Sequence, residues 1–243
     1  MDDSWHASRI EKPKTYWKEE HLDPDPTFRA RRCLEISGTK RREMEVDVAV
    51  EENVNIVLNG GCVTVLAALP AQLKEMAVGF LIGEGLVESF QDISSVREEK
   101  GSLICETRDG KAAPWKGHQC CSVGGAAIQN LKPIDSKIRI KASAILSAVD
   151  QLNESAKLWR RTGATHTSII CDVDGKILAS CEDASRSSSV DKTVGAALLA
   201  GVNLSRCALI TSGRLSGVMV AKAAGSWFSS SIHWPITLGG YME

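Results

Sequence analysis

The chain has 243 residues, and its 29 lysines and arginines nearly balance its 30 aspartates and glutamates, for a formal net charge of −1. This length provides one large domain or two small ones, and the charge balance argues against a dedicated nucleic-acid binder. The N-terminus lacks the features of a secretory signal, and no apolar run approaches the roughly 18 residues of a membrane span. We therefore expect a cytoplasmic protein without nucleic-acid or membrane partners, whose eight cysteines are mostly reduced.

Residues 1–40 are polar and contain three of the seven prolines. This composition predicts an irregular N-terminal arm. The basic stretches Arg29–Arg32 and Lys40–Arg42 fit a solvated segment better than a binding site.

Residues 41–135 are expected to form a smaller β-rich subdomain that ends in a cysteine-containing loop. The patterns predict, in chain order, a half-buried strand, a β-hairpin, a helix opened by proline and a short strand, over 44–50, 54–66, 70–83 and 103–106. Asn59-Gly60-Gly61 supplies the glycine that a hairpin turn needs for positive φ.

Residues 136–243 alternate between helical and strand patterns. A long amphipathic helix is predicted over 142–160, where Gly163 stops it. Strands and helices then alternate: strands at 167–171, 177–180 and 207–211, and helices at 190–201 and 217–224. This alternation predicts an α/β domain with a mixed sheet.

The most informative spot is the adjacent pair Cys120-Cys121, within a glycine-rich stretch that runs from Lys116 to Ala127. Neighbouring Cα atoms lie about 3.8 Å apart, below the roughly 4.4–6.8 Å of a disulfide, so the two thiols are poor partners for each other. Flanking glycines make the backbone mobile, and Lys116 and His118 favour a thiolate. Two interpretations stay open from these residues alone: an exposed sulfur carrier, or a chance pair of thiols on a surface loop.

The other cysteines show no metal-ligand pattern. The chain has no Cys-x-x-Cys and no regular spacing of Cys and His, so we expect no metal held by the protein itself. Four cysteines within apolar runs are expected to be buried: Cys62, Cys105, Cys171 and Cys207.

Three polar loops of the C-terminal half are expected at strand ends, over 162–166, 182–192 and 211–216. Ligands of open α/β sheets gather where strands end and helix N-termini offer free N–H groups to anions. Small hydroxyl residues and the cations Arg186 and Arg214 suit a ligand that bears phosphate. Each loop alone is also compatible with helix capping. The three together favour a pocket.

Five motifs occur in an order typical of one family: 79–85 (GFLIGEG), 162–166 (TGATH), Glu182-Asp183, 190–192 (VDK) and 211–214 (TSGR). With these motifs, the chain resembles the formate dehydrogenase accessory protein family (FdhD/NarQ) from about Glu51 to Lys222. The resemblance implies a homodimer whose fold is similar to that of cytidine deaminases, with a mixed sheet and flanking helices.

The resemblance also implies an activity. Family members look like sulfurtransferases that take persulfide sulfur from a cysteine desulfurase and pass it to the molybdenum bis-pterin guanine dinucleotide cofactor of formate dehydrogenase, whose catalytic subunit is then a partner. By this resemblance Cys121 becomes the persulfide, with Cys120 as its companion. The polar loops are expected to hold the guanine dinucleotide, with arginines on phosphate and aspartates on guanine N–H groups: His166, Asp183, Arg186, Asp191, Ser212 and Arg214.

Several positions depart from the family's pattern. With Cys121 as the first cysteine of the family's Cys-x-x-Cys loop, Gly124 takes the place of the second. The histidine usual before Val-Asp-Lys is absent from 185–189, and Val218 stands where a glutamate is usual. Residues 227–243 do not resemble the family's closing segment, which predicts a shortened or divergent C-terminal part.

Two rival functions stay open. A non-catalytic chaperone of the same family would keep the cofactor pocket while its changed cysteine loop no longer transfers sulfur. A zinc deaminase is raised by the related fold alone, and its metal-binding elements are missing, since His166-Thr167-Ser168 has no glutamate and the chain has no Cys-x-x-Cys. The sulfur carrier is therefore the expected function.

Overall fold

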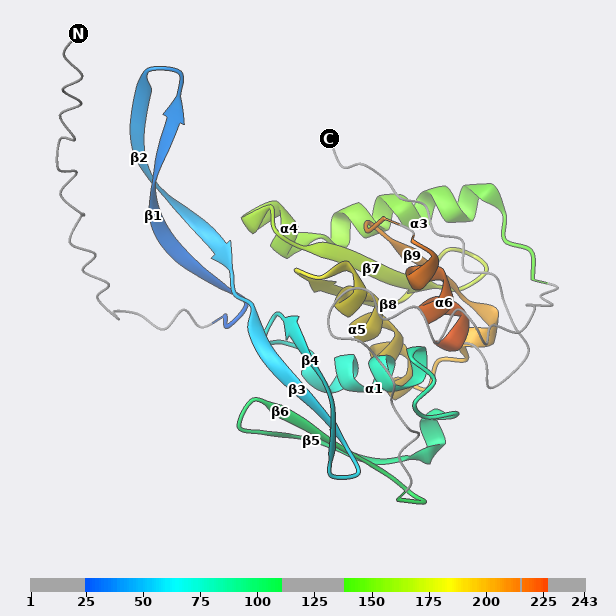
Figure 1. Ribbon diagram of the computed structural model, residues 1–243. Coiled ribbons are helices and arrows are strands. Elements are labelled where there is room, and N and C mark those ends of the chain that lie inside the picture. The colour runs from blue at the N-terminus through cyan, green and yellow to red at the C-terminus, as the bar shows by residue number, and fades with distance from the viewer. Residues whose placement is uncertain (1–24, 111–137, 215, 227–243) are drawn as a thin grey trace, which may run out of the picture.

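The computed structural model describes residues 25–110, 138–214 and 216–226. Within these residues a two-stranded ribbon projects away from a body built on a four-stranded and a three-stranded sheet (Figure 1). Helices α1 (Leu73–Gly83) and α5 (Arg186–Leu199) pack against each other between the two larger sheets. The predicted α/β class with helix-flanked sheets is confirmed, whereas the likeness to cytidine deaminases stays a prediction.

The projecting ribbon consists of β1 (Phe28–Ser37) and β2 (Lys40–Ala49), joined by a tight turn at Gly38, which has a φ of 61°. The expected irregular arm over 1–40 is therefore wrong for β1. The error has a physical cause. Arg32 interrupts the alternation of Phe28, Ala30, Leu34 and Ile36 with polar residues, and the many arginines give the segment the composition of a solvated one. Phe28 is the only residue of β1 that is buried.

The four-stranded sheet has the order β4-β3-β6-β5, with a parallel pairing between β3 and β6. Its strands are β3 Glu52–Leu58, β4 Gly61–Ala68, β5 Ile93–Glu99 and β6 Ser102–Thr107, and the short helix η1 Phe90–Asp92 precedes β5. The predicted hairpin is confirmed, and its turn residues Asn59 and Gly60 have φ values of 48° and 80°. Ile56, Leu103 and Leu81 belong to a shared core that joins this sheet to α1.

The three-stranded sheet has the order β8-β7-β9, and both pairings are antiparallel. Its elements are β7 His166–Cys171, β8 Ile177–Asp183, β9 Ala208–Thr211, η2 Leu204–Arg206, α3 Ala142–Ser155, α4 Lys157–Thr162 and α6 Gly217–Ser226. One face packs on α5 and α6 through Ile170, and the other packs on α3 through Ile169. The parallel pairing that makes a mixed sheet thus lies in the N-terminal sheet instead of here.

The single helix predicted over 142–160 is broken into α3 and α4 at Ala156. Glu182 on β8 explains the break. Its carboxylate accepts hydrogen bonds from the N–H groups of Leu158 and Trp159 at 2.8 and 2.9 Å, which caps a new helix. The longest described helices, α3 and α5, have 14 residues each, and none of the described helices is long and apolar enough to cross a membrane.

The contact between α1 and α5 depends on two glycines. A Cβ on Gly79 would lie 1.9 Å from the carbonyl oxygen of Asp191, and a Cβ on Gly195 would lie 1.8 Å from that of Glu75. The two backbones therefore approach as closely as glycine allows. This crossing joins the predicted 41–135 and 136–243 parts into one body.

Candidate functional site

The three polar loops meet at one edge of the three-stranded sheet. β7 begins at His166, whereas β8 ends at Asp183 and β9 ends at Thr211. Because β7 is antiparallel to both neighbours, His166 lies opposite Asp183, and Ser168 lies opposite Thr211. The start of β7 and the loops that follow β8 and β9 are thus brought together, as the sequence predicts.

Ser212 connects the end of β9 to the start of β7. Its Oγ accepts a hydrogen bond from Thr167 N at 3.0 Å and lies 3.5 Å from His166 Nδ1, while its own N–H donates to the Thr167 carbonyl at 2.9 Å. Burial lowers the pKa of His166, and the positive charges of Arg186 and Arg214 lower it further. His166 is therefore mostly a neutral imidazole at neutral pH, able to donate from one nitrogen and accept at the other.

Arg186, the first residue of α5, places a buried donor at the same edge. Its Nε is buried and has no hydrogen-bond partner among the described residues. Gly213 lies directly against this side chain, since a Cβ there would be 2.7 Å from Arg186 Cβ. Buried donors in native proteins nearly always have a partner, and an anion held between Arg186 and the exposed Arg214 would supply one.

Buried hydroxyl groups hold α5 against the sheet beneath this edge. Ser168 Oγ lies 2.8 Å from Ser189 Oγ and donates to Thr211 Oγ1 at 2.9 Å, and Thr193 Oγ1 donates to the Ser168 carbonyl at 3.1 Å. These contacts set the start of α5 and with it the position of Arg186. Sequence reasoning missed them, because serine and threonine in a loop before a helix are also typical of helix caps.

Asp183 lies in the protein interior instead of facing a ligand. Its Oδ2 is 2.7 Å from Lys192 Nζ and accepts from Leu69 N at 3.0 Å, while its Oδ1 accepts from Ser185 N at 2.8 Å. Both carboxylate oxygens are engaged, and the side chain is fully buried. The structure thus gives Asp183 a supporting place, in contrast to its expected contact with guanine N–H groups.

Asp191 is likewise buried, on the α1 and α6 side of α5. Both of its oxygens lie 2.9 Å from Lys222 Nζ, which is also 2.8 Å from Glu84 Oε1. Burial raises the pKa of Asp191 to about 6, although the charge of Lys222 acts in the opposite direction. Burial also acts to lower the pKa of Lys222, but the attraction of Asp191 and Glu84 prevails, and this pKa is raised. The carboxylate of Asp191 is therefore engaged by Lys222 of α6.

Comparison of the chain with known proteins identifies its family. The model of the FdhD/NarQ family matches residues 49–229. The chain belongs to this family. It is 33% identical over 187 residues to Sulfur carrier protein FdhD of Methanothermobacter thermautotrophicus, with 75% of each chain covered. It is 30% identical over 192 residues to Sulfur carrier protein FdhD of Wolinella succinogenes, with 74% of this chain and 67% of the relative covered.

A solved structure shares the fold. A protein from Desulfotalea psychrophila, assigned as a formate dehydrogenase accessory protein, matches with a TM-score of 0.70 and 24% identity, over 84% of this chain and 81% of that chain. Three of the FdhD/NarQ motifs seen in the sequence contribute to the two buried ion clusters, through Glu84, Asp183, Asp191 and Lys192. These motif residues hold the body together, whereas His166, Arg186, Ser212 and Arg214 form the open edge.

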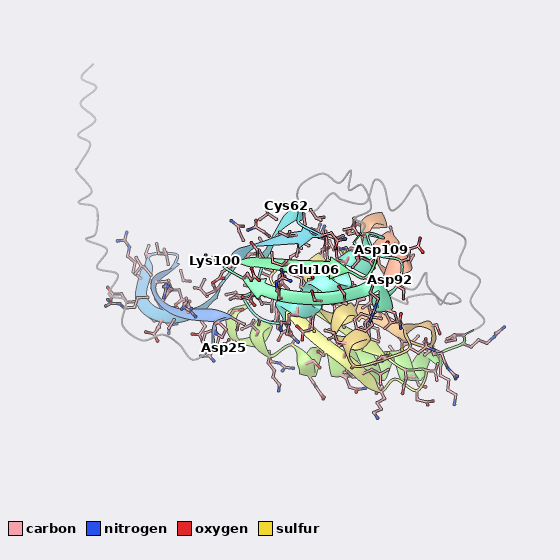
Figure 2. The ribbon with its side chains drawn as sticks, turned by 90° about the horizontal axis from the view of Figure 1, so that it is seen from below. Asp25, Cys62, Asp92, Lys100, Glu106 and Asp109 are labelled. Atoms are coloured by element: carbon pink, nitrogen blue, oxygen red, sulfur yellow. The ribbon has the colours of Figure 1, made fainter. Side chains whose placement is uncertain are left out.

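The Cys120-Cys121 pair lies outside the described residues. Among the described cysteines, Cys33 is exposed. Cys62 is exposed as well (Figure 2), so its expected burial is wrong. Cys105 is buried as expected, and this burial raises the pKa of its thiol to about 12. Cys171 and Cys207 are buried as well. Within the described ranges no three His, Cys, Asp or Glu side chains gather as a metal site.

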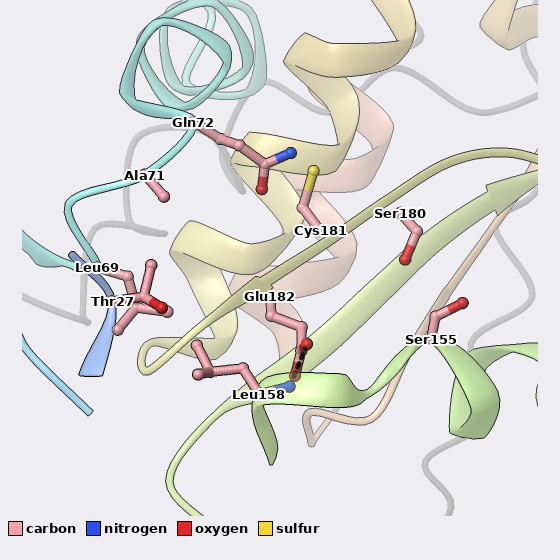
Figure 3. Close-up of a pocket in the computed structure, with 9 residues that line it drawn as sticks. All are labelled: Thr27, Leu69, Ala71, Gln72, Ser155, Leu158, Ser180, Cys181 and Glu182. Atoms are coloured by element: carbon pink, nitrogen blue, oxygen red, sulfur yellow. Dashed lines mark hydrogen bonds between the residues drawn. The ribbon is translucent and has the colours of Figure 1, made fainter. Parts of the chain in front are cut away.

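A separate pocket of about 220 Å³ lies beside β8 (Figure 3). Its lining comes from the start of the ribbon, the segment before α1, the α3–α4 junction and β8: Thr27, Leu69, Ala71, Gln72, Ser155, Leu158, Ser180, Cys181 and Glu182. Glu182 is its one charged lining residue, and that carboxylate already caps α4. None of the predicted site residues lines this pocket.

Proposed function

We propose that this protein carries sulfur for the maturation of formate dehydrogenase. It accepts persulfide sulfur from a cysteine desulfurase and delivers it to the molybdenum bis-pterin guanine dinucleotide cofactor of the dehydrogenase's catalytic subunit. Membership of the FdhD/NarQ family supports the proposal, as do relatives named sulfur carrier proteins. It acts in the cytoplasm as a homodimer.

Cys121 is the proposed carrier, and Cys120 is its companion. The Cys121 thiolate attacks the terminal sulfur of the desulfurase persulfide, a new S–S bond forms at Cys121, and the desulfurase cysteine leaves as a thiolate. On delivery an electron pair of the cofactor forms the new bond to the terminal sulfur, the S–S bond at Cys121 breaks, and Cys121 leaves as a thiolate. Lys116 and His118 in the same stretch favour the thiolate form that both transfers use.

The proposed cargo site is the edge formed by His166, Arg186, Ser212 and Arg214. The observation that carries it is the buried Arg186 Nε, which has no partner among the described residues and lies beside a loop opened by Gly213. The two arginines bind phosphate of the guanine dinucleotide, while the neutral His166 and Ser212 supply hydrogen bonds. Asp183 and Asp191, expected as direct ligands, instead keep α5 in place.

Binding of guanosine diphosphate to the purified protein tests this site. We expect Arg186→Gln and Arg214→Gln each to weaken binding by about tenfold, since each removes a charge-assisted contact to phosphate. Arg206→Gln is the matched control, because Arg206 is an exposed arginine of η2, outside the three loops. An equal loss with Arg206→Gln, or no binding to the unaltered protein, would contradict the assignment.

A cofactor-binding chaperone without sulfur transfer is the second candidate. Gly124 favours it, because the family's second loop cysteine is missing there. Single replacements of Cys120 and Cys121 by alanine, followed by measurement of formate dehydrogenase activation, separate the two functions. A sulfur carrier loses activation with Cys121→Ala, whereas a chaperone keeps it with both variants.

A further inference from the structure

The β1–β2 ribbon sorts its charged residues onto two faces. In an antiparallel pair, directly opposite residues share a face, and so do alternate residues along each strand. By this register one face, here called the cationic face, carries four cations and one anion: Arg29, Arg31, Lys40, Arg42 and Glu35. The opposite face, here called the acidic face, carries three anions and two cations: Glu43, Glu45, Asp47, Arg32 and Arg41.

The cationic face also has an apolar middle. Met44, Val46 and Val48 of β2 lie on it, opposite Cys33, Arg31 and Arg29 of β1. Val48 is 45% exposed although it is a large apolar residue. Apolar residues surrounded by arginine are typical of the centre of a protein–protein interface, where arginine is enriched and most other charged residues are depleted.

The body of the protein holds the base of the ribbon by the other face. Phe28 is buried beneath the guanidinium of Arg161, whose Cζ lies 3.5 Å from the ring centroid, and Arg161 also pairs with Asp47 at 2.5 Å. Phe28 and Asp47 both belong to the acidic face. The anchor therefore fixes the direction of the ribbon and leaves the cationic face turned away from α4, on an element that extends far from the body (Figure 1).

We propose that the cationic face is a docking surface for an acidic patch on a partner protein. The charge excess sets the sign of the partner surface, and the apolar middle favours a protein over a nucleic acid. A two-stranded hairpin alone is of marginal stability, so a ribbon of ten residue pairs that the body contacts only at its base is stabilised by a partner that covers it. The ribbon lies almost wholly before residues 49–229, which the family model matches.

The test uses the formate dehydrogenase catalytic subunit as the probe, and in this respect the inference rests on the proposed function. Arg31→Glu with Lys40→Glu reverses two charges of the cationic face. Arg32→Glu with Arg41→Glu is the matched control, because it makes the same charge change at neighbouring positions of the acidic face. Binding of the full chain to the immobilised subunit is measured by biolayer interferometry, and circular dichroism checks that both variants stay folded.

We expect the cationic-face variant to weaken binding by about tenfold or more and the control by no more than about twofold. Raising the salt concentration from about 50 to about 300 mM should weaken binding of the unaltered chain and have less effect on the cationic-face variant. Equal losses in both variants, or no loss in either, would overturn the proposal. So would a loss that follows Leu34→Ser with Ile36→Ser instead, because those exposed residues lie on the acidic face.

Further measurements distinguish an acidic partner protein from other molecules that could bind the cationic face, and distinguish failure of this proposal from failure of the proposed function. Binding of a duplex RNA to the unaltered chain and to the cationic-face variant is the first measurement. If the variant loses binding to the RNA but still binds the subunit, the face binds nucleic acid and the proposal is overturned. Loss of self-association in sedimentation, again with subunit binding unchanged, would assign it to a second copy of the chain. Sulfur loading of Cys121 by a desulfurase is followed separately, so its failure would reject the proposed function without deciding the docking result.

Discussion

Asp183 and Lys192 form an ion pair of 2.7 Å in which both side chains are completely buried. The pair also binds both backbone polar groups of Leu69. Asp183 accepts a hydrogen bond from the Leu69 N–H, and Lys192 donates one to the Leu69 carbonyl, each at 3.0 Å. Leu69 lies between β4 and α1, whereas Asp183 and Lys192 belong to β8 and α5. The junction of the two sheets therefore depends on two opposite charges.

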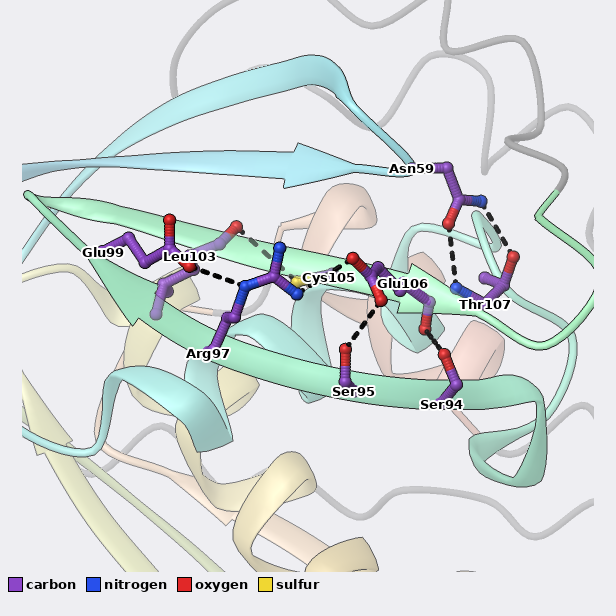
Figure 4. A network of polar contacts seen from close by, with 9 residues as sticks. All are labelled: Asn59, Ser94, Ser95, Arg97, Glu99, Leu103, Cys105, Glu106 and Thr107. Carbon is purple, nitrogen blue, oxygen red and sulfur yellow. Dashed lines mark hydrogen bonds and ion pairs between the residues drawn. The ribbon is translucent and has the colours of Figure 1, made fainter.

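Removal of the cation from this pair should destabilise the fold strongly. Lys192→Met leaves Asp183 buried without its counter-charge, and we expect the free energy of unfolding to fall by about 3–5 kcal/mol. Urea unfolding followed by circular dichroism measures the change. Arg97→Ala is the control, because Arg97 forms solvent-exposed ion pairs with Glu99 and Glu106 at 2.7 and 2.9 Å (Figure 4). Solvent screening makes such pairs weak, so a comparable loss in both variants would contradict the account.

The glycine crossing of α1 and α5 predicts a steric effect. Gly79→Ala and Gly195→Ala each place a methyl group within 2 Å of a carbonyl oxygen of the facing helix, namely 1.9 and 1.8 Å. The helices must separate, which should cost at least about 1–3 kcal/mol of the free energy of unfolding. Gly61→Ala is the comparison, since its Cβ would meet only the Leu58 carbonyl at an ordinary 3.5 Å. Equal melting temperatures for the three variants would show that α1 and α5 are less closely packed than these distances indicate.

The buried Asp191 predicts a specific pH dependence. Burial raises its pKa from 3.8 to about 6, so the folded protein binds this proton more tightly than the unfolded chain. Its contribution to stability is then present below about pH 4 and is lost as the pH rises through about 6. Asp191→Asn does not titrate, and its free energy of unfolding, relative to the unaltered protein, should increase by up to about 3 kcal/mol between about pH 4 and pH 7.

The matched control for this titration is Asp150→Asn, because Asp150 is exposed on α3. The increase between about pH 4 and pH 7 should be larger for Asp191→Asn than for this control. A constant or decreasing difference for Asp191→Asn would mean that the carboxylate is not the group whose pKa is raised.

His166 predicts a measurable titration at the proposed cargo site. Burial and the charges of Arg186 and Arg214 lower its pKa below the ordinary 6.5. Nuclear magnetic resonance of the imidazole should therefore give a midpoint below 6.5 in the unaltered protein and a higher midpoint in Arg186→Gln. The midpoint should not move in Arg206→Gln. An unchanged midpoint in Arg186→Gln would place that guanidinium away from His166.

The sequence predicts those features that depend on local chemistry. Asn59 and Gly60 form the expected turn, because two residues of positive φ suffice to define it. The edge around His166 and Ser212 was also predictable, since polar loops at the ends of neighbouring strands meet once the strands pair. The order of strands and helices in the C-terminal half was predictable as well, because each element has its own local pattern of apolar residues.

Features that depend on contacts distant in the sequence were not predictable. Glu182 ends one helix and starts another at Ala156, and no local pattern reports a cap that comes from β8. Asp183 was expected to contact the ligand because the resemblance places it in a polar loop and a carboxylate can accept from guanine N–H groups, whereas here it forms a buried ion pair with Lys192. In the ribbon strand β1, Arg32 interrupts the alternation of apolar residues, so the strand depends on its pairing with β2.

The most direct test of the sulfur carrier is mass spectrometry of the protein after incubation with a cysteine desulfurase and cysteine. The account predicts that the peptide containing Cys120 and Cys121 gains one sulfur atom and that Cys121→Ala abolishes the gain. Cys33→Ala and Cys62→Ala, which alter the exposed cysteines outside the loop, should leave it unchanged. A loop that stays unmodified in the unaltered protein, or a gain that survives Cys121→Ala and is lost with Cys33→Ala or Cys62→Ala, would contradict the assignment of Cys121 as the carrier.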